Sequence, residues 1–289
     1  MYESLLPLLA CPACKHESLS FMGHSCEGRL VDGTLACSHC TQQYPVENEI
    51  AVLVDPAQHI DDWHWEVDIE SLETFAAFDT AYANSMPADV RGNRPLLISR
   101  IMHVANQSEG PILDIATGRG VLLRELSLLL TNDYPLIGID IDLKVLRGLQ
   151  RFLRRAGLYE PVSLIAMDAK DIAFRAGSMG VVTSWFGFNN VPEAWPALQQ
   201  AEAVLAPGGF LATSVLNVLP DSPSHLLASD AGFADFLTED AVRASFAETS
   251  LTLKTLETIT ESLWPGNPYD ALPLMGERFY HRLVIAQKQ

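Results

Sequence analysis

The chain has 289 residues, of which 48% are hydrophobic and 19% are charged, a composition typical of a soluble globular protein. It carries 36 acidic residues against 19 Lys and Arg, so its net charge is −17. Lys and Arg are absent between Arg29 and Arg91, which makes this segment a poor surface for nucleic acid phosphates. No apolar run has membrane-spanning length, and no basic region precedes Leu5. We therefore expect a cytoplasmic protein without a membrane partner.

Two Cys-x2-Cys pairs near the N-terminus predict a metal site. The pairs Cys11–Cys14 and Cys37–Cys40 are separated by 22 residues. Four thiolates can surround a tetrahedral Zn²⁺ ion, with two supplied by each turn. Disulfide bonds are the alternative, but the expected cytoplasmic location disfavours them. We predict that His39 is a bystander, that Cys26 is a free thiol, and that structural Zn²⁺ is held by the remaining cysteines. The predicted ligands are Cys11, Cys14, Cys37 and Cys40.

The sequence around these pairs carries a family resemblance over about the first 55 residues. Residues 8–15 read Leu-Leu-Ala-Cys-Pro-Ala-Cys-Lys, and Tyr44-Pro45-Val46 is followed by an apolar stretch over 50–54. These segments resemble the small zinc-ribbon activator proteins that partner tRNA, rRNA and release-factor methyltransferases. The resemblance implies a β-rich zinc-ribbon domain over residues 1–55 that stabilises or completes a catalytic domain. Zinc held by four thiolates has no open position for a substrate water, which agrees with such a role.

Residues 56–109 form a bridge in which aromatic and acidic residues are interleaved. Apolar residues recur at helical spacing from Trp65 to Phe75, which predicts an amphipathic helix. Breaks are expected at Met86-Pro87 and Gly92–Pro95, and a further helix is expected over 96–106. We predict a helical linker whose aromatic residues either belong to the core or cover a substrate pocket.

Strand and helix patterns alternate from residue 111 onward, as in a doubly wound α/β sheet. We therefore predict a Rossmann-like domain over residues 110–289. The expected strands are 112–115, 136–140, 162–166, 180–184, 210–215, 252–259 and 279–286. The expected helices are 121–130, 143–155 and 195–205, with a helical insertion over 222–247.

The turn after the first of these strands predicts an adenosine-containing cofactor. Residues 112–120 read Ile-Leu-Asp-Ile-Ala-Thr-Gly-Arg-Gly, and the next strand ends at Asp140. A strand, a glycine turn and a carboxylate on the second strand are typical of such sites. The third glycine of a dinucleotide fingerprint is missing after Gly120, and Asp114 suits a cationic group better than a phosphate. This pattern disfavours a nicotinamide dehydrogenase.

Residues 114–120 resemble motif I of class I S-adenosylmethionine-dependent methyltransferases, Asp/Glu-x-Gly-x-Gly-x-Gly, with Ala116 in place of the first glycine. The resemblance covers about 110–289 and implies a methyltransferase domain that uses S-adenosylmethionine. It implies that Asp114 holds the cofactor ammonium, and that Asp140, rather than Asp142, holds the ribose hydroxyls.

The third strand completes the implied cofactor site. Asp168 would accept a hydrogen bond from the adenine amino group, and the backbone of Ala169 would contact a ring nitrogen. The glycines leave room for the cofactor where a side chain would collide. The implied cofactor-binding residues are Asp114, Ala116, Thr117, Gly118, Gly120, Asp140, Ile141, Asp168, Ala169 and Ser184.

The end of the fourth strand departs from a known pattern. Many amine methyltransferases have Asn/Asp-Pro-Pro-Tyr/Phe here, whereas residues 184–190 read Ser-Trp-Phe-Gly-Phe-Asn-Asn. The departure puts methylation of nucleobase or glutamine amino groups in doubt. The aromatic residues at 185–188 either suit an apolar or planar substrate or pack in the core. No motif identifies a catalytic residue among the polar candidates His64, Tyr82, Asn189 and His225.

The one concentration of positive charge lies on the helix expected over 143–155. Its basic residues recur at intervals that place most of them on one side. This side is a solvated helix face, or it docks to the acidic segment or to an anionic substrate. The residues are Lys144, Arg147, Arg151, Arg154 and Arg155.

These observations favour a methyltransferase that uses S-adenosylmethionine and carries its zinc ribbon in the same chain. The acidity of the chain favours a small-molecule acceptor over RNA, whereas the zinc-ribbon resemblance favours RNA or a protein of the translation machinery. The alternative from another class is a non-catalytic adaptor with a methyltransferase-like domain. Ala116 and the unusual fourth strand favour the adaptor, and the retained acids and glycines of the motif argue against it.

Overall fold

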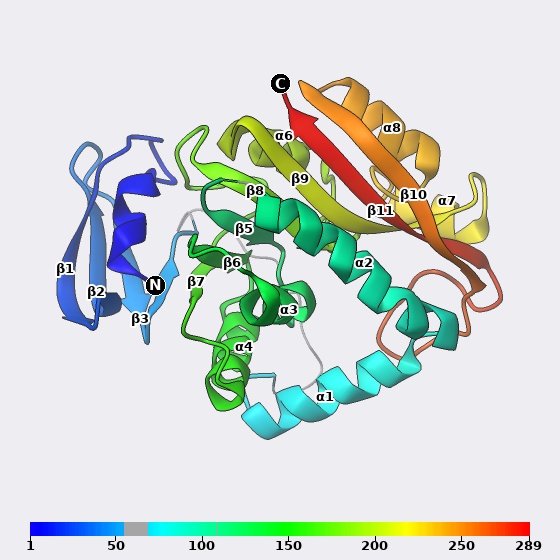
Figure 1. Cartoon of the computed structure of the whole chain (residues 1–289), viewed down its shortest axis with the longest axis horizontal. Coiled ribbons are helices and arrows are strands. Elements are labelled where there is room, and N and C mark those ends of the chain that lie inside the picture. Colours follow the sequence, from blue (N-terminus) through cyan, green and yellow to red (C-terminus); the bar gives the residue numbers. More distant parts are fainter. Residues whose placement is uncertain (55–68, 108) are drawn as a thin grey trace.

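The computed structural model describes residues 1–54, 69–107 and 109–289. The strands of the N-terminal part are β1 (Leu19–Cys26), β2 (Arg29–Cys37), β3 (Gln43–Glu47) and β4 (Ile50–Val52). The remaining strands are β5 (Ile112–Ile115), β6 (Leu136–Asp140), β7 (Val162–Ala166), β8 (Met179–Trp185), β9 (Leu205–Val218), β10 (Leu251–Leu263) and β11 (Arg278–Lys288). All of them join in one sheet with the order β1-β2-β3-β4-β7-β6-β5-β8-β9-β11-β10 (Figure 1).

The helices cover both faces of this sheet. The N-terminal part contains one 3₁₀ helix, η1 (Glu3–Leu8). The α-helices are α1 (Leu72–Ser85), α2 (Ala88–Gln107), α3 (Val121–Leu129), α4 (Leu143–Ala156), α5 (Gly187–Asn190), α6 (Trp195–Val204), α7 (Pro223–Asp230) and α8 (Glu239–Ala247). No helix among these described elements combines the length and apolarity that a bilayer crossing demands.

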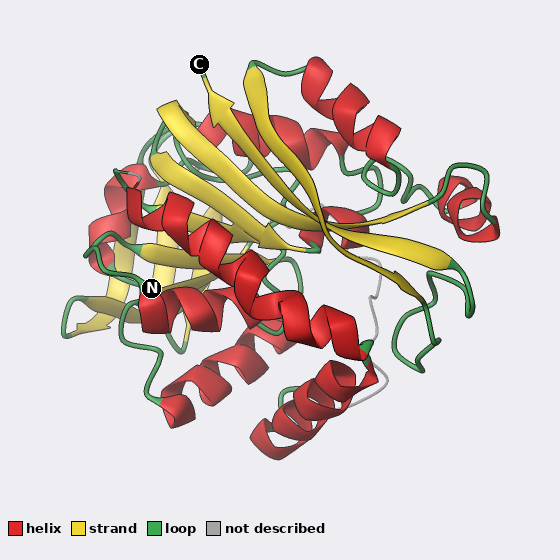
Figure 2. Ribbon diagram, turned by 45° about the vertical axis from the view of Figure 1, so that its right-hand side comes forward, coloured by secondary structure: helices red, strands yellow, loops and turns green. Residues whose placement is uncertain are grey.

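The relative direction of neighbouring strands changes across the sheet. Strands β7, β6, β5, β8 and β9 are parallel, and β11 then inserts antiparallel between β9 and β10. This arrangement confirms the doubly wound α/β class, including the antiparallel pair at the end of the chain. Successive residues of β5 face opposite sides, because Ile112 belongs to the core beneath α2, α3 and α4, and Leu113 belongs to the core beneath α6 and α8. Figure 2 shows α2 lying across the strands.

The cysteine-rich β region is continuous with the large sheet. Strands β1 to β4 pair antiparallel, and β4 then pairs parallel with β7, with Ala51 opposite Ile165 and Val52 opposite Ala166. The N-terminal region therefore provides the backbone hydrogen bonds that the edge of β7 would otherwise lack. The boundaries of the predicted domains at 55 and 109 stay predictions.

The helical bridge differs from the sequence expectation. Helix α1 begins at Leu72, and its N-cap Ser71 accepts a hydrogen bond from the Thr74 amide, whereas Trp65 lies outside the described residues. The break expected at Gly92–Pro95 is wrong, because α2 continues through both residues. Burial explains the continuity: the Leu97, Ile98 and Ile101 side chains pack into the core, and this packing outweighs the hydrogen bond that proline removes.

Candidate functional site

The carboxyl ends of the parallel strands bring the predicted cofactor residues to one edge of the sheet. Neighbouring strands β5 and β8 lead to opposite halves of the sheet, so their ends form the switch point where ligands bind in such folds. The turn after β5 is held there by two hydrogen bonds to β6. The Thr117 amide donates to the Ile139 carbonyl at 2.9 Å, and the Gly118 amide donates to Asp140 Oδ2 at 2.8 Å.

This turn has three residues with left-handed backbones, namely Ala116 (φ +48°), Gly118 (φ +51°) and Gly120 (φ +68°). The glycines are needed for different reasons. A Cβ on Gly120 would lie 2.6 Å from Leu149 Cδ1, whereas a Cβ on Gly118 would meet no atom within 4 Å. Gly120 therefore permits close packing on α4, and Gly118 leaves open space beside the turn, whose occupation by a cofactor stays a prediction.

Asp114 lies at the end of β5 with only 1% of its surface exposed. Its two carboxylate oxygens accept hydrogen bonds from the hydroxyls of Thr117 at 2.6 Å and Thr183 at 2.8 Å. Burial nevertheless raises the pKa of Asp114 to about 6, with the nearby Asp140 as a further cause. The carboxylate orders the turn, and its contact with a cofactor ammonium stays a prediction.

Asp140 is half-buried at the end of β6 and faces the glycine turn. Besides Gly118, its other oxygen accepts the Asp142 amide at 3.0 Å. The Ile141 amide is a further backbone partner of this carboxylate, and the role of Asp140 in holding the ribose hydroxyls stays a prediction. Burial raises the pKa of Asp140 to about 6. Asp142 instead caps α4, where its side chain accepts the amides of Lys144 and Val145, which agrees with the preference for Asp140.

The third and fourth strands contribute the remaining predicted residues. Asp168 is 6% exposed, and its Oδ1 accepts the Lys170 amide at 2.8 Å. Ala169 is buried beside it, and Ile141 is half-buried after Asp140. Ser184 is fully buried: its hydroxyl donates to the Ile115 carbonyl at 2.9 Å and accepts the Gly187 amide at 3.1 Å. Ser184 thus ties β8 to β5, and its contact with a cofactor stays a prediction.

Of the polar candidates from the sequence that the structure describes, Tyr82 reaches the glycine turn, through the turn residue Arg119. The Asn189 side chain forms hydrogen bonds with the backbone of Leu216 and Phe236. On α7, His225 accepts a hydrogen bond from the Asp221 amide at its Nδ1. His64 lies outside the described residues. The Tyr82 hydroxyl contacts both oxygens of Asp270 at 3.0 Å.

Sequence reasoning missed a contact between the glycine turn and α1. Arg119, inside the turn, forms an ion pair with Asp79 on α1, and its guanidinium lies 4.0 Å from the Tyr82 ring centroid. Arg124 on α3 binds the second oxygen of Asp79 at 2.8 Å. Asp79 thus bridges the two arginines and holds α1 beside the turn. No spacing rule relates a turn arginine to an acid 40 residues earlier, so the sequence offered no signal.

The four predicted metal ligands lie close together within the N-terminal region. Their Sγ atoms are all within 4.8 Å of one another, and Cys11–Cys40 and Cys14–Cys37 are each 3.6 Å apart. Tetrahedral zinc with Zn–S bonds of about 2.3 Å requires S–S distances of about 3.8 Å. The cluster therefore fits one tetrahedral ion, while Cys26 is exposed on β1.

Both cysteine pairs adopt the same turn. The amide of Lys15 donates to the Cys11 carbonyl at 2.8 Å, and the amide of Thr41 donates to the Cys37 carbonyl at 3.2 Å. Lys15 and Thr41 also share a positive φ, at +58° and +63°. Two equivalent turns facing each other are the geometry expected of a four-thiolate site.

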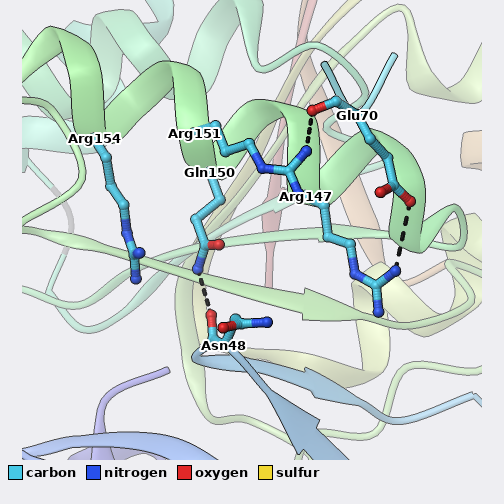
Figure 3. A pocket seen from close by; sticks show the side chains of 6 residues that line it. All are labelled: Asn48, Glu70, Arg147, Gln150, Arg151 and Arg154. Atoms are coloured by element: carbon cyan, nitrogen blue, oxygen red, sulfur yellow. Dashed lines mark hydrogen bonds and ion pairs between the residues drawn. The ribbon is translucent and has the colours of Figure 1, made fainter. Parts of the chain in front are cut away.

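The basic face of α4 docks to the acidic segment, which confirms one of the two sequence interpretations for part of it. Arg147 pairs with Glu47 at 2.5 Å and with Glu70 at 3.5 Å, and Arg154 pairs with Glu49 at 2.7 Å. A pocket of about 350 Å³ lies along this contact between α4 and the acidic segment (Figure 3). Its lining residues are Asn48, Glu70, Arg147, Gln150, Arg151 and Arg154.

Arg29 on β2 makes a further contact, which joins the N-terminal region to the loop before β7. Its guanidinium donates to the carbonyls of Tyr159 at 3.0 Å, Glu160 at 2.6 Å and Val162 at 3.1 Å, and it also stacks 3.9 Å from the Tyr2 ring centroid. The side chain is almost fully buried. One arginine thus satisfies the backbone of the loop that leads into β7.

Two family models match separate parts of the chain. Residues 112–209 match the family model described as a methyltransferase domain, and residues 3–49 match the model described as Trm112p-like protein. The first match contains the glycine turn, Asp140 and Asp168, and the second contains all four clustered cysteines.

Individual relatives are more distant. The chain is 31% identical over 100 residues to the ubiquinone/menaquinone biosynthesis C-methyltransferase UbiE of Coxiella burnetii, covering 35% of this chain and 40% of the relative. The chain thus spans about two fifths of the length of the curated relatives that it matches.

Two solved structures show the same fold. Geranyl diphosphate C-methyltransferase from Streptomyces coelicolor A3(2) aligns with a TM-score of 0.53 and 15% identity, over 68% of this chain and 77% of the other. The cyclase SpnF aligns with a TM-score of 0.53 and 14% identity, over 80% and 87%. At these identities the likeness concerns the fold alone. The chain combines an N-terminal Trm112p-like domain with a class I methyltransferase domain.

Proposed function

We propose that the chain transfers a methyl group from S-adenosylmethionine to a small-molecule acceptor. The observation that carries the proposal is the glycine turn, whose Gly118 amide is bonded to Asp140 at the switch point of the sheet. Two carboxyl groups whose pKa burial raises, Asp114 and Asp140, lie at this point. Such a site favours a ligand that carries both a hydroxylated ribose and positive charge.

S-adenosylmethionine supplies an electrophilic methyl group on its sulfonium when bound. The protein would hold the two reactants in line, which in favourable cases lowers the barrier by about 7–11 kcal/mol. Asp140 would orient the ribose, and the open space at Gly118 would admit the rest of the cofactor. Transfer to a nucleophile that carries no acidic proton requires no catalytic base.

A small acceptor agrees with the charge of the chain and with the relatives. A net charge of −17 opposes a polyanionic acceptor, and the basic residues Arg147 and Arg154 are already paired with glutamates. The matched relatives are C-methyltransferases of quinone biosynthesis. Five cysteines without a disulfide also fit a reducing compartment such as the cytoplasm.

Isothermal titration with S-adenosylmethionine and S-adenosylhomocysteine tests the proposal. We expect both to bind the wild-type chain, and Asp140→Ala to weaken binding at least 100-fold. Asp142→Ala is the matched control, because it removes a helix cap two residues away and leaves Asp140 in place. The absence of binding to the wild-type chain would overturn the proposal.

Two other functions have one supporting observation each. The left-handed Ala116 favours a non-catalytic adaptor, for which the cofactor would bind but no acceptor would be methylated. The Trm112p-like domain favours an acceptor in the translation machinery. Incubation with methyl-labelled cofactor and either total RNA or a small-molecule extract separates these cases by the fraction that acquires the label.

A further inference from the structure

His281 is a buried histidine that the site described above leaves unused. It lies on β11 with 1% of its surface exposed, and neither ring nitrogen has a hydrogen-bonding partner within the described structure. Burial lowers the pKa of His281 to about 4, so the ring is neutral at pH 7. A neutral imidazole has one donor and one acceptor, and leaving both unpaired in the interior costs stability. Such a group in a native fold calls for an explanation, and recognition of a ligand is one that leaves the fold intact.

The neighbours of this imidazole lie at the end of β8. The Phe186 ring centroid is 4.5 Å away, tilted by 36°, and the Trp185 centroid is 5.7 Å away and nearly perpendicular. Both aromatic side chains are half-buried. The imidazole therefore carries the hydrogen-bond acceptor of this group of three rings, since the Trp185 indole N–H can only donate, and the two aromatic faces suit a flat partner.

Phe186 adds an independent indication of function. Its backbone is left-handed, with φ +58° and ψ +11°, which is rare for a bulky residue and is stored mostly at functional sites. The next residue is Gly187, on which a Cβ would lie 2.9 Å from Ala116 Cβ. The strained backbone thus places the Phe186 ring against His281 and places its own chain directly beside the glycine turn.

We infer that Trp185, Phe186 and His281 form the acceptor subsite, in which the His281 imidazole hydrogen-bonds a hydroxyl group on a flat, largely apolar acceptor. This inference rests on the proposed function, because it places the acceptor next to the cofactor turn. A hydroxyl both donates and accepts, so it complements a neutral imidazole. Trp185 and Phe186 contact the ring of the acceptor.

The test uses the full chain saturated with S-adenosylhomocysteine and two probes of equal shape. 2-Naphthol carries the hydroxyl group, and naphthalene lacks it. Quenching of tryptophan fluorescence measures their affinities in the wild-type chain, in His281→Phe, and in the control His225→Phe on α7. We expect the wild type and the control to bind 2-naphthol about tenfold more tightly than naphthalene. In His281→Phe the two affinities become equal.

A second measurement distinguishes recognition from a structural role. Because His281 makes no internal hydrogen bond, His281→Phe should keep or raise the melting temperature and leave the affinity for S-adenosylhomocysteine unchanged. A lower melting temperature, no binding of 2-naphthol to the wild type, or an unchanged preference in His281→Phe would overturn the inference. Failure of S-adenosylhomocysteine itself to bind would instead overturn the proposed function.

Discussion

Ala116 occupies a backbone conformation that glycine adopts at lower cost. Its φ of +48° costs an L-residue about 1–2 kcal/mol. A glycine avoids this strain but lowers the stability of the folded chain by about 0.5–1 kcal/mol, because it gives the unfolded chain more conformational freedom. We therefore predict that Ala116→Gly stabilises the chain by about 0–1 kcal/mol and does not weaken cofactor binding. Urea unfolding measures the first effect and titration calorimetry the second.

The matched variant at this position is Ala116→Val. A β-branched residue fits the left-handed region poorly, and its larger side chain would lie beside Gly187, on which a Cβ alone would come within 2.9 Å of Ala116 Cβ. We expect a destabilisation of about 2 kcal/mol or more. If the glycine variant were the less stable of the two, the strain at Ala116 would be absent.

The carboxyl groups of Asp114 and Asp140 make cofactor binding depend on pH. Burial raises the pKa of each to about 6, so their ionised forms, which attract a cation, are lost as the pH falls below 6. We predict that the affinity for S-adenosylmethionine decreases about tenfold or more between pH 7 and pH 5. Titration calorimetry at several pH values measures this decrease, and an affinity that is constant down to pH 5 would contradict it.

The same pKa shifts have the opposite effect on the stability of the cofactor-free protein. Because the folded pKa lies above the unfolded value, the contribution of each group to stability is fully present below pH 4 and is lost as the pH rises through 6. A cationic ligand offsets this loss. The rise in melting temperature caused by S-adenosylmethionine should therefore be larger at pH 7.5 than at pH 5.

At the scale of elements, β2 holds the N-terminal region to β7 mainly through Arg29. Arg29→Ala would remove three charge-assisted hydrogen bonds, although the Tyr159 carbonyl keeps the Val162 amide and the Glu160 carbonyl keeps the Tyr2 hydroxyl as donors. We therefore predict a loss of about 2–4 kcal/mol in the free energy of unfolding. Arg29→Lys keeps the charge but lacks the planar fork, and we expect an intermediate loss. Urea unfolding checks both, and a loss of less than about 0.5 kcal/mol in the alanine variant would contradict the anchor role.

The elements that the sequence predicted well are those with local signals. Apolar runs bounded by turns identified β5 to β8, and the structure shows that α4 is bounded by Asp142 as N-cap and Gly157 as a left-handed C-cap. Helix α2 was interrupted in the prediction at Pro95, because local propensity does not register how strongly Leu97 and Ile101 are buried.

The elements and residues that the sequence did not predict depend on contacts between distant segments. The pairing of β4 with β7 joins Ala51 to Ile165, and no local pattern reports it. His281 lies between Tyr280 and Arg282 in a strand of mixed polarity, and only its burial without partners distinguishes it from a solvent-exposed histidine. The cysteine pairs and the glycine turn were recognisable because their chemistry needs fixed residue types at fixed spacing.

For the whole molecule, the continuous sheet makes the metal site relevant to the methyltransferase domain. Cys37→Ser with Cys40→Ser should lose the metal, which we expect to be zinc, and lower the melting temperature of the entire chain, because a structural ion contributes folding energy directly. Metal analysis and circular dichroism check this prediction. Cys26→Ser, outside the cluster, should change neither, and a wild-type chain without bound metal would contradict the site.

The unfolding of the two regions should also coincide. Release of the metal and loss of helical circular dichroism are expected at the same urea concentration, because β4 belongs to the same sheet as β5 to β9. Release of the metal at a lower concentration would show that the N-terminal region unfolds independently.

The covalent link between β4 and the rest of the sheet has a consequence for assembly. A separate polypeptide that supplied β4 would have to find the edge of β7 by diffusion, and its occupancy would depend on the abundance of both molecules. Within one chain the encounter is intramolecular, so the effective concentration does not depend on the abundance of the protein. The stoichiometry is then fixed at synthesis, dilution does not separate the two parts, and no competing methyltransferase can remove the strand from its place beside β7.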